Sequence, residues 1–237
     1  MLKESKGVSV MIIKVSNIEI ELVRKNIKNM HLYVMRPDGS IRITAPKRIS
    51  EETIRQFIIS RYDWIKKQQE KISSEPKEEP ITYSSGDQLQ IFGELYTLEV
   101  VFAKKTQFSF FNGRAILYCK KDTSAEQREK IAEKELRCAL SKELEEIIKK
   151  WESITDLHPS SFQIKKMKTR WGTCNTRTRK IWLNYELIHS KRECIEYVVM
   201  HELAHLKVPN HGKDFIALMD RYMPCWKDLR EELNKKR

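Results

Sequence analysis

The feature that most constrains this chain is the segment His201-Glu202-Leu203-Ala204-His205, which has the pattern H-E-x-x-H. On a helix, residues four apart lie one turn along the same face, so the imidazoles of His201 and His205 can reach one metal ion. Glu202 points about a quarter turn away, beside a water molecule on that ion, where its carboxylate can act as general base. The motif therefore predicts a catalytic metal site on a helix.

A third metal ligand is needed, and His211 follows six residues after His205. Lys207, Pro209 and Gly212 interrupt the helix where the chain must turn back toward the ion. Three histidines leave one coordination position open for water, as in catalytic zinc sites. Carboxylates downstream are alternative third ligands, namely Asp214, Asp220, Glu231 and Glu232.

The flanking sequence helps to decide between two interpretations of the motif, namely a metal site and a helix whose histidines bind no metal. Residues 194–206 are expected to be helical, because Ile195, Val199, Leu203 and Leu206 repeat at helical spacing on the face opposite the two histidines. Three of the six histidines fall within eleven residues. Both observations favour the metal site.

Composition bounds the class of protein. The chain has 237 residues, of which 40% are hydrophobic and 33% charged, which suits a soluble globular protein of one large or two small domains. It has no apolar run long enough to cross a bilayer, so no membrane association is expected. Five scattered cysteines without a C-x-x-C pair predict reduced thiols and a cytoplasmic location.

The charge suggests an anionic partner. The formal net charge is +12, and residues 163–180 hold seven lysines and arginines without an acidic residue. Solvated helix faces explain part of such an excess, but this basic run directly precedes the metal helix. Nucleic acid stays open as a partner, although no known nucleic-acid-binding motif accompanies the charge.

The first half of the chain is expected to be rich in strands. Residues 30–44 form a hairpin around Pro37-Asp38-Gly39, and one helix begins after Ser50 and continues to about Ile72. Residues 73–80 are a polar linker bounded by prolines. Strands at 88–92 and 96–102 precede a hairpin over 108–119 with an Asn112-Gly113 turn.

The second half alternates between helices and short strands. Residues 125–151 carry the longest apolar stripe at helical spacing, and two strands follow at 164–167 and 180–183. Amphipathic helices are expected around Phe215 and after Pro224. The sequence shows no internal repeat. We therefore predict an α+β protein divided into residues 1–75 (hairpin and helix), 76–123 (strand-rich) and 124–237 (catalytic).

Several motifs, taken in order, resemble the YgjP-like metal-dependent hydrolase family. They are Arg170-Trp171-Gly172-Thr173-Cys174, the segment Ile181–Leu187, the segment Tyr197–Leu206, Asn210-His211 and Phe215. The region of Phe92-Gly93-Glu94 and Tyr96 also resembles the N-terminal part of that family. The family has R-W-G-S-C at the first motif, so Thr173 replaces a serine and keeps its hydroxyl. The chain is also similar to SprT-like proteases, which act near DNA.

The resemblance implies a zincin-like metallopeptidase domain, with the active-site helix beside a small sheet. It implies Zn2+ on His201, His205 and His211, with Glu202 catalytic. Metzincins share the six-residue step to the third histidine but have glycine where this chain has Val208, so their turn after the helix does not transfer directly.

Three functions follow from these residues. The first is a zinc-dependent peptidase or amidase, in which Arg170 and Tyr197 are candidates for stabilising the oxyanion. The second is a metal-dependent nucleoside triphosphate hydrolase whose basic run binds phosphates. The third is a DNA-associated protease or a nucleic-acid-binding module with a structural metal. Candidate partners are thus peptides, proteins, nucleotides or nucleic acid, and the oligomeric state is open.

Cys174 is also considered as a catalytic nucleophile. The sequence shows no histidine that is recognisable as its partner, which argues against this role.

Overall fold

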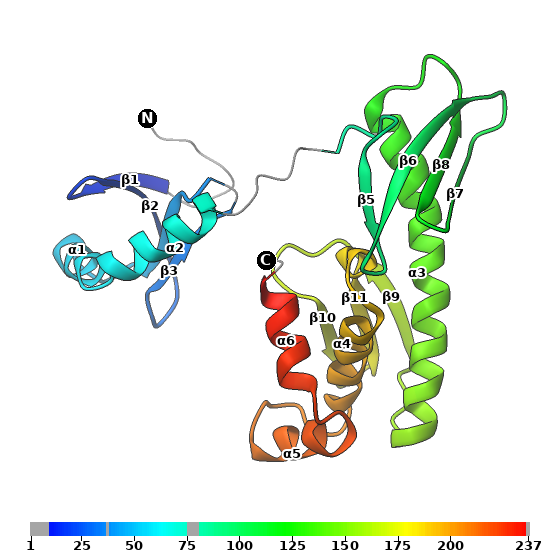
Figure 1. Ribbon diagram of the computed structural model, residues 1–237. Helices are drawn as coiled ribbons and strands as arrows, with labels where there is room; N and C mark the ends of the chain where they lie inside the picture. The colour runs from blue at the N-terminus through cyan, green and yellow to red at the C-terminus, as the bar shows by residue number, and fades with distance from the viewer. Residues whose placement is uncertain (1–9, 37, 75–80, 236–237) are drawn as a thin grey trace. The chain divides into compact units, whose positions relative to one another are not determined.

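The computed structural model describes residues 10–36, 38–74 and 81–235, and the chain forms two compact units, Met1–Glu79 and Pro80–Arg237 (Figure 1). Each unit has a hydrophobic core of its own. The strand-rich residues 81–123 belong to the same unit as residues 124–235. Most of the predicted linker, residues 75–80, lies outside the described residues. No helix in the described ranges is long and apolar enough to span a membrane.

The first unit is a four-stranded sheet followed by two helices. The strands are arranged in the order β1-β2-β4-β3, with the central pair parallel and both outer pairs antiparallel. The predicted hairpin over residues 30–44 is confirmed as the β3–β4 pair. The elements are β1 (Val10–Val15), β2 (Ile18–Lys25), β3 (His31–Val34), β4 (Ile41–Pro46), α1 (Glu51–Ile59) and α2 (Tyr62–Ser74).

The prediction of one continuous helix from Ser50 to about Ile72 was wrong. Ser50 does cap α1, because its Oγ accepts a hydrogen bond from the Thr53 N–H at 3.1 Å. The helix then ends at Ser60, whose hydroxyl donates to the Phe57 carbonyl at 2.8 Å. Hydroxyl side chains that bond to nearby backbone groups compete with the helix, and here a new helix begins at Tyr62.

The second unit begins with a sheet of the same topology. Its strands have the order β5-β6-β8-β7, again with a parallel central pair between two antiparallel pairs. The sequence shows no repeat, so the structural repeat of this arrangement was not predicted. The predicted strand pairs are confirmed as β5 (Gln88–Ile91) with β6 (Glu94–Phe102), and β7 (Gln107–Phe111) with β8 (Arg114–Cys119).

A long helix connects this sheet to the rest of the unit. Helix α3 (Ala125–Thr155) runs past the sheet and along β9 and α4 (Figure 1). Its buried stripe, which includes Leu136, Leu140, Leu144 and Ile147, joins both parts into one core. The predicted long helix is thereby confirmed and extends four residues further.

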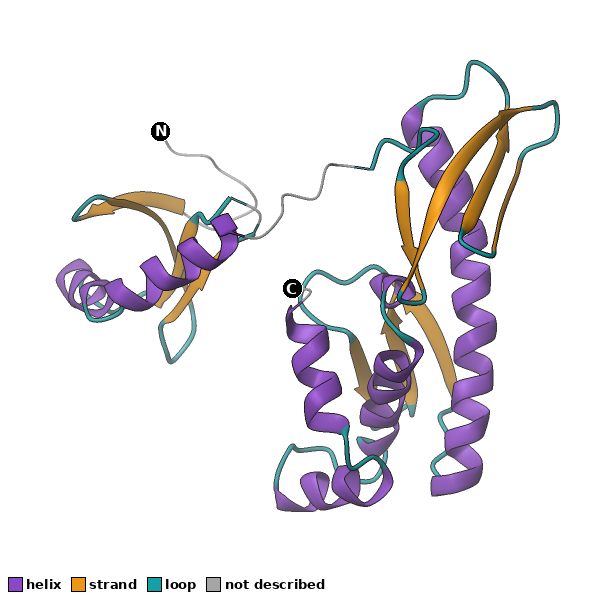
Figure 2. Cartoon of the chain, in the orientation of Figure 1, coloured by secondary structure: helices purple, strands orange, loops and turns teal. Residues whose placement is uncertain are grey.

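The remaining elements form a small sheet, one short 3-10 helix and three α-helices (Figure 2), so the α+β class is confirmed. The sheet has the order β10-β11-β9, and β10 was not predicted. Helix α4 packs against α3, α5, α6, β10 and β11, and is buried along almost its whole length. The elements are β9 (Ser161–Lys165), β10 (Gly172–Asn175), β11 (Lys180–Asn184), the short η1 helix (Tyr185–His189), α4 (Arg192–Ala204), α5 (Lys213–Tyr222) and α6 (Trp226–Lys235).

Candidate metal centre

The three predicted histidines lie together in the structure. His201 is in the last turn of α4, His205 follows directly at the helix end, and His211 lies in the turn before α5. One nitrogen from each ring lies within 4.8 Å of the others. The Nε2 atoms of His201 and His211 are 3.0 Å apart. Two ligands on a tetrahedral zinc ion at 2.0–2.1 Å lie about 3.3 Å apart, so the spacing of His201 and His211 suits such an ion.

The alternative carboxylate ligands do not join this cluster. Asp220 accepts a hydrogen bond from Trp226 Nε1 at 2.7 Å and pairs with Lys227. Glu231 pairs with Lys235, and Glu232 pairs with Lys191 at 2.9 Å. Asp214 lies in the first turn of α5 and is not in the cluster either. Among the described residues, the donor set is therefore made of histidines alone.

The surroundings of the rings favour neutral imidazoles. The Nδ1 atom of His205 lies 3.2 Å from the Val208 carbonyl, which can only accept, so the neutral ring carries its proton there and keeps the Nε2 lone pair free. Burial, together with the nearby His205, His211 and Arg230, lowers the pKa of His201 to about 3. Burial likewise lowers the pKa of His205. Neutral imidazole is the form that binds a metal.

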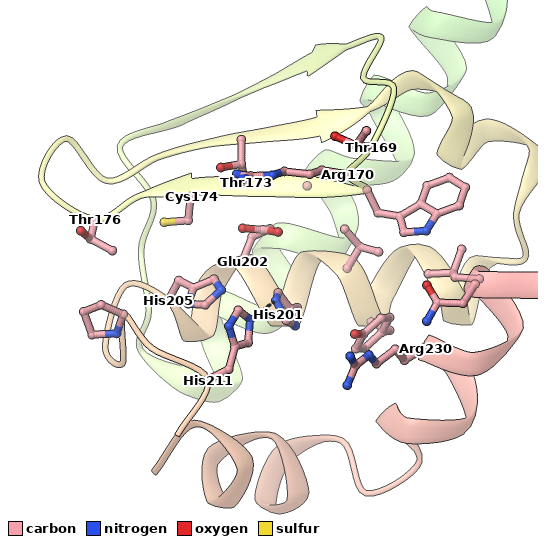
Figure 3. A pocket seen from close by; sticks show the side chains of 17 residues that line it. Thr169, Arg170, Thr173, Cys174, Thr176, His201, Glu202, His205, His211 and Arg230 are labelled. Carbon is pink, nitrogen blue, oxygen red and sulfur yellow. Dashed lines mark hydrogen bonds between the residues drawn. The ribbon is translucent and has the colours of Figure 1, made fainter. Parts of the chain in front are cut away.

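Glu202 lies in a buried position between α4 and strand β10 (Figure 3). Its side chain is 4% exposed, and its Oε2 has no hydrogen-bond partner among the described residues. Burial raises the pKa of this carboxyl to about 8, while the charge of Arg170 opposes the rise. A buried polar atom without a partner calls for an explanation, such as a bound ion or water or a role in catalysis.

Gly172 explains how β10 approaches Glu202 so closely. A Cβ at this position would lie 2.6 Å from Oε1 and 2.7 Å from Cγ of Glu202. Such distances are far shorter than a van der Waals contact, so any side chain would push the strand and the carboxylate apart. Glycine thus lets the strand cover the carboxylate.

A cavity of about 510 Å³ opens above the histidines (Figure 3). Helix α4 provides its floor with Tyr197, His201 and Glu202. Strand β10 and the residues before it form one wall, and α6 forms another with Arg230 and Leu233. The volume falls in the usual range for ligand sites.

Arg170 and Tyr197, the two candidates for the oxyanion, both line this cavity. Tyr197 is buried. Its ring lies edge-on to the His201 ring, with 5.8 Å between the ring centroids, and it stacks on the Trp226 ring, with 6.4 Å between the centroids. Arg170 is exposed and precedes β10. The structure brings both side chains to the site.

The loop that carries Arg170 is held by Asn184, which is 2% exposed. Its Nδ2 donates to the carbonyls of Arg170 and Met167, both at 2.8 Å. Its Oδ1 accepts from the N–H groups of Met167 and Glu186 at 3.1 and 3.2 Å. The side-chain amide is therefore fully bonded and fixes the backbone at the cavity rim.

Two features of the cavity were missed from sequence. Arg230 was not predicted, because its helix reads as an ordinary amphipathic helix and nothing local shows that it folds back over the metal helix. The close packing of Gly172 on Glu202 depends on β10, which was missed as well. Cys174 lines the cavity, but burial and Glu202 raise the pKa of its thiol to about 11, which disfavours the nucleophilic thiolate.

The protein family to which the chain belongs supports a metal-dependent hydrolase. The chain belongs to the YgjP-like family: the family model described as YgjP-like, metallopeptidase domain, matches residues 28–236. No curated protein matches the sequence.

Two solved structures show partial similarity. One is the metallopeptidase zymogen of Pyrococcus abyssi abylysin, with 20% identity, a TM-score of 0.37, and coverage of 39% of this chain and 93% of that chain. The other is the metallopeptidase zymogen of Methanocaldococcus jannaschii jannalysin, with 22% identity, a TM-score of 0.36, and coverage of 39% and 95%.

Proposed function

We propose that this chain is a zinc-dependent peptidase in which His201, His205 and His211 bind the metal and Glu202 is the general base. One observation carries the proposal. Three imidazole nitrogens lie within 4.8 Å of one another, beside a buried carboxylate with an unpaired oxygen. A donor set of three neutral histidines suits zinc and leaves a position open for chemistry.

When bound, zinc supplies a Lewis acid that polarises a carbonyl group and lowers the pKa of water to about 7. Glu202 accepts the proton of the attacking water on its Oε2 and returns it to the leaving amine. Strand β10 shields this carboxylate from bulk solvent, since Gly172 lies against it. Arg170 and Tyr197 are the candidates for stabilising the charge on the carbonyl oxygen.

The wall of the cavity favours an extended peptide as substrate. Strand β10 is at the edge of its sheet, in the order β10-β11-β9, and Gly172, Thr173 and Cys174 line the cavity. An edge strand offers backbone N–H and C=O groups with which a peptide can pair. Nucleoside triphosphate hydrolysis usually uses Mg²⁺ on carboxylates, and Glu202 is the only acidic side chain described along this cavity.

Metal content and turnover of point variants test the proposal. We expect about one equivalent of zinc in the purified protein, lost in His201→Ala and His205→Ala but retained in Glu202→Gln. Turnover of a peptide substrate should fall about 100-fold or more in Glu202→Gln, the usual range for loss of a general base. The control is His158→Ala, because His158 bonds Asp156 on the surface and lies outside the cluster.

Two results would contradict it. Zinc retained at full occupancy in the His201→Ala/His205→Ala double variant would refute the assignment of the ligands. Unchanged turnover in Glu202→Gln would remove the role of general base, whatever the metal content.

A further inference from the structure

Two arginines enter the cavity from opposite walls. Arg170 lies beside Glu202 on the β10 side, and Arg230 extends from α6 near the end of the cavity away from Thr176 (Figure 3). Within the part of the chain that the structure describes, neither guanidinium has a hydrogen-bond or ion-pair partner. Two other arginines of the same unit are paired, since Arg137 bonds Glu133 and Arg192 bonds Glu143, both at 2.9 Å.

The charge of Arg230 is not balanced by its neighbours along α6. The adjacent Glu231 pairs with Lys235, and Glu232 pairs with Lys191. Tyr197 and His201, which line the same cavity as Arg230, carry no negative charge to offset it. Arg230 is therefore an exposed cation that lines the cavity and has no ion-pair partner among the described residues.

The backbone that carries Arg230 is firmly held. Trp226 and Leu233, on either side of it in α6, are 6% and 1% exposed. Trp226 stacks on Tyr197 and donates from Nε1 to Asp220. A guanidinium on such a fixed helix binds an anion with less loss of freedom than one on a mobile loop.

We propose that Arg230 binds a carboxylate of the peptide substrate, so that this enzyme prefers peptides with an acidic group next to the scissile bond. The carboxylate is that of an acidic side chain or of a free C-terminus. A guanidinium holds either one through two parallel, charge-assisted hydrogen bonds. This inference rests on the proposed peptidase function and adds the class of substrate to it.

Four peptides of one sequence test the proposal, with Asp or Asn at one position and with a free or amidated C-terminus. We expect kcat/KM to be about 10- to 100-fold higher for a peptide with the recognised carboxylate, which is the usual gain from a hydrogen bond to a charged group. The preference should disappear in Arg230→Gln, mainly through KM, because the contact serves binding. The Asp/Asn pair and the free/amidated pair show which carboxylate is read.

The matched control is Arg221→Gln. Arg221 is an exposed arginine on α5 that packs over the Tyr222 ring and does not line the cavity. This variant should keep the full preference. A preference of the same size in Arg230→Gln, or none in the unaltered enzyme, would overturn the proposal. Stronger competition by a nucleoside triphosphate than by any of the peptides would overturn it too.

Calorimetric titration of the four peptides into zinc-loaded Glu202→Gln separates this inference from the proposed function. Tighter binding of the carboxylate peptides, lost when Arg230→Gln is added, supports the inference even if the unaltered enzyme hydrolyses none of the four. Equal binding of charged and neutral peptides overturns it even if all four are hydrolysed.

Discussion

The sheet of the first unit and the sheet at the start of the second unit have the same strand order, the same parallel central pair and a Ser-capped helix after the last strand. Their cores correspond in register. In the parallel pair of the first sheet, Ile20 is aligned with Ile41 and Leu22 with Ile43. In that of the second sheet, Leu98 is aligned with Ala115 and Val100 with Leu117. Among the residues that the structure describes, the candidate metal centre is found only in the second unit.

The helix after each sheet also differs between the two units. In the first unit it breaks at Ser60, and its two parts pack mainly on their own sheet. In the second, α3 is unbroken over 31 residues and reaches beyond its sheet to pack on α4 and η1. A similar sheet-and-helix arrangement thus packs mainly on itself in the first unit, whereas in the second unit it supports the candidate metal centre.

Metal binding gives the largest expected difference between the units. With zinc at 1,000 times its dissociation constant, the second unit should gain about 4 kcal/mol of stability, because the ion binds only its folded form. The first unit has no such cluster among its described residues and should gain nothing. Differential scanning calorimetry with and without a chelator measures both transitions.

A parallel thermal scan followed by tryptophan fluorescence shows which of the two transitions belongs to the second unit, because this unit holds four of the five tryptophans. The His201→Ala/His205→Ala variant is the control and should show no response to zinc. A zinc-induced rise in both transitions would mean that the two units unfold together, and the comparison between them would fail.

Local pattern was enough to predict the metal cluster and the hairpins. His201 and His205 are brought together by the spacing of a helix, and the Asn112-Gly113 turn joins β7 and β8 by itself. Features that depend on distant parts of the chain were missed. Strand β10 is short and is defined by its pairing with β11, and Arg230 reaches the cavity only because α6 folds back over α4.

A smaller difference is expected between two glycines in turns of the second unit. Gly93 and Gly113 have φ values of +84° and +73°, so alanine is strained at either by about 1–2 kcal/mol. At Gly93 a Cβ would also lie 2.6 Å from Cγ and 3.0 Å from Cα of Lys191, where α4 begins. Overpacking of this kind adds about 1–3 kcal/mol.

Urea unfolding of Gly93→Ala and Gly113→Ala measures this contrast. We expect the larger loss of stability, together with reduced turnover, in Gly93→Ala, because the β5–β6 turn supports the start of the metal helix. The β7–β8 turn is the control, since a Cβ at Gly113 meets nothing closer than the Leu95 carbonyl at 4.0 Å. Equal losses in the two variants would show that the contact with Lys191 is of no consequence.

The smallest expected effects come from the two serines that cap the corresponding helices. Ser50 accepts from the Thr53 N–H at 3.1 Å, and Ser124 accepts from the Gln127 N–H at 3.3 Å. Loss of such a cap destabilises a helix by about 1 kcal/mol. Ser124→Ala should lower only the stability of the second unit and Ser50→Ala only that of the first, as measured by the two calorimetric transitions. Ser141→Ala, a change at a partly exposed position inside α3 whose hydroxyl makes only a long 3.4 Å bond to Glu145, is the control and should have little effect. If either cap variant lowers both transitions equally, the helices do not belong to separate cooperative units, because a cap acts only on the unit that contains its helix.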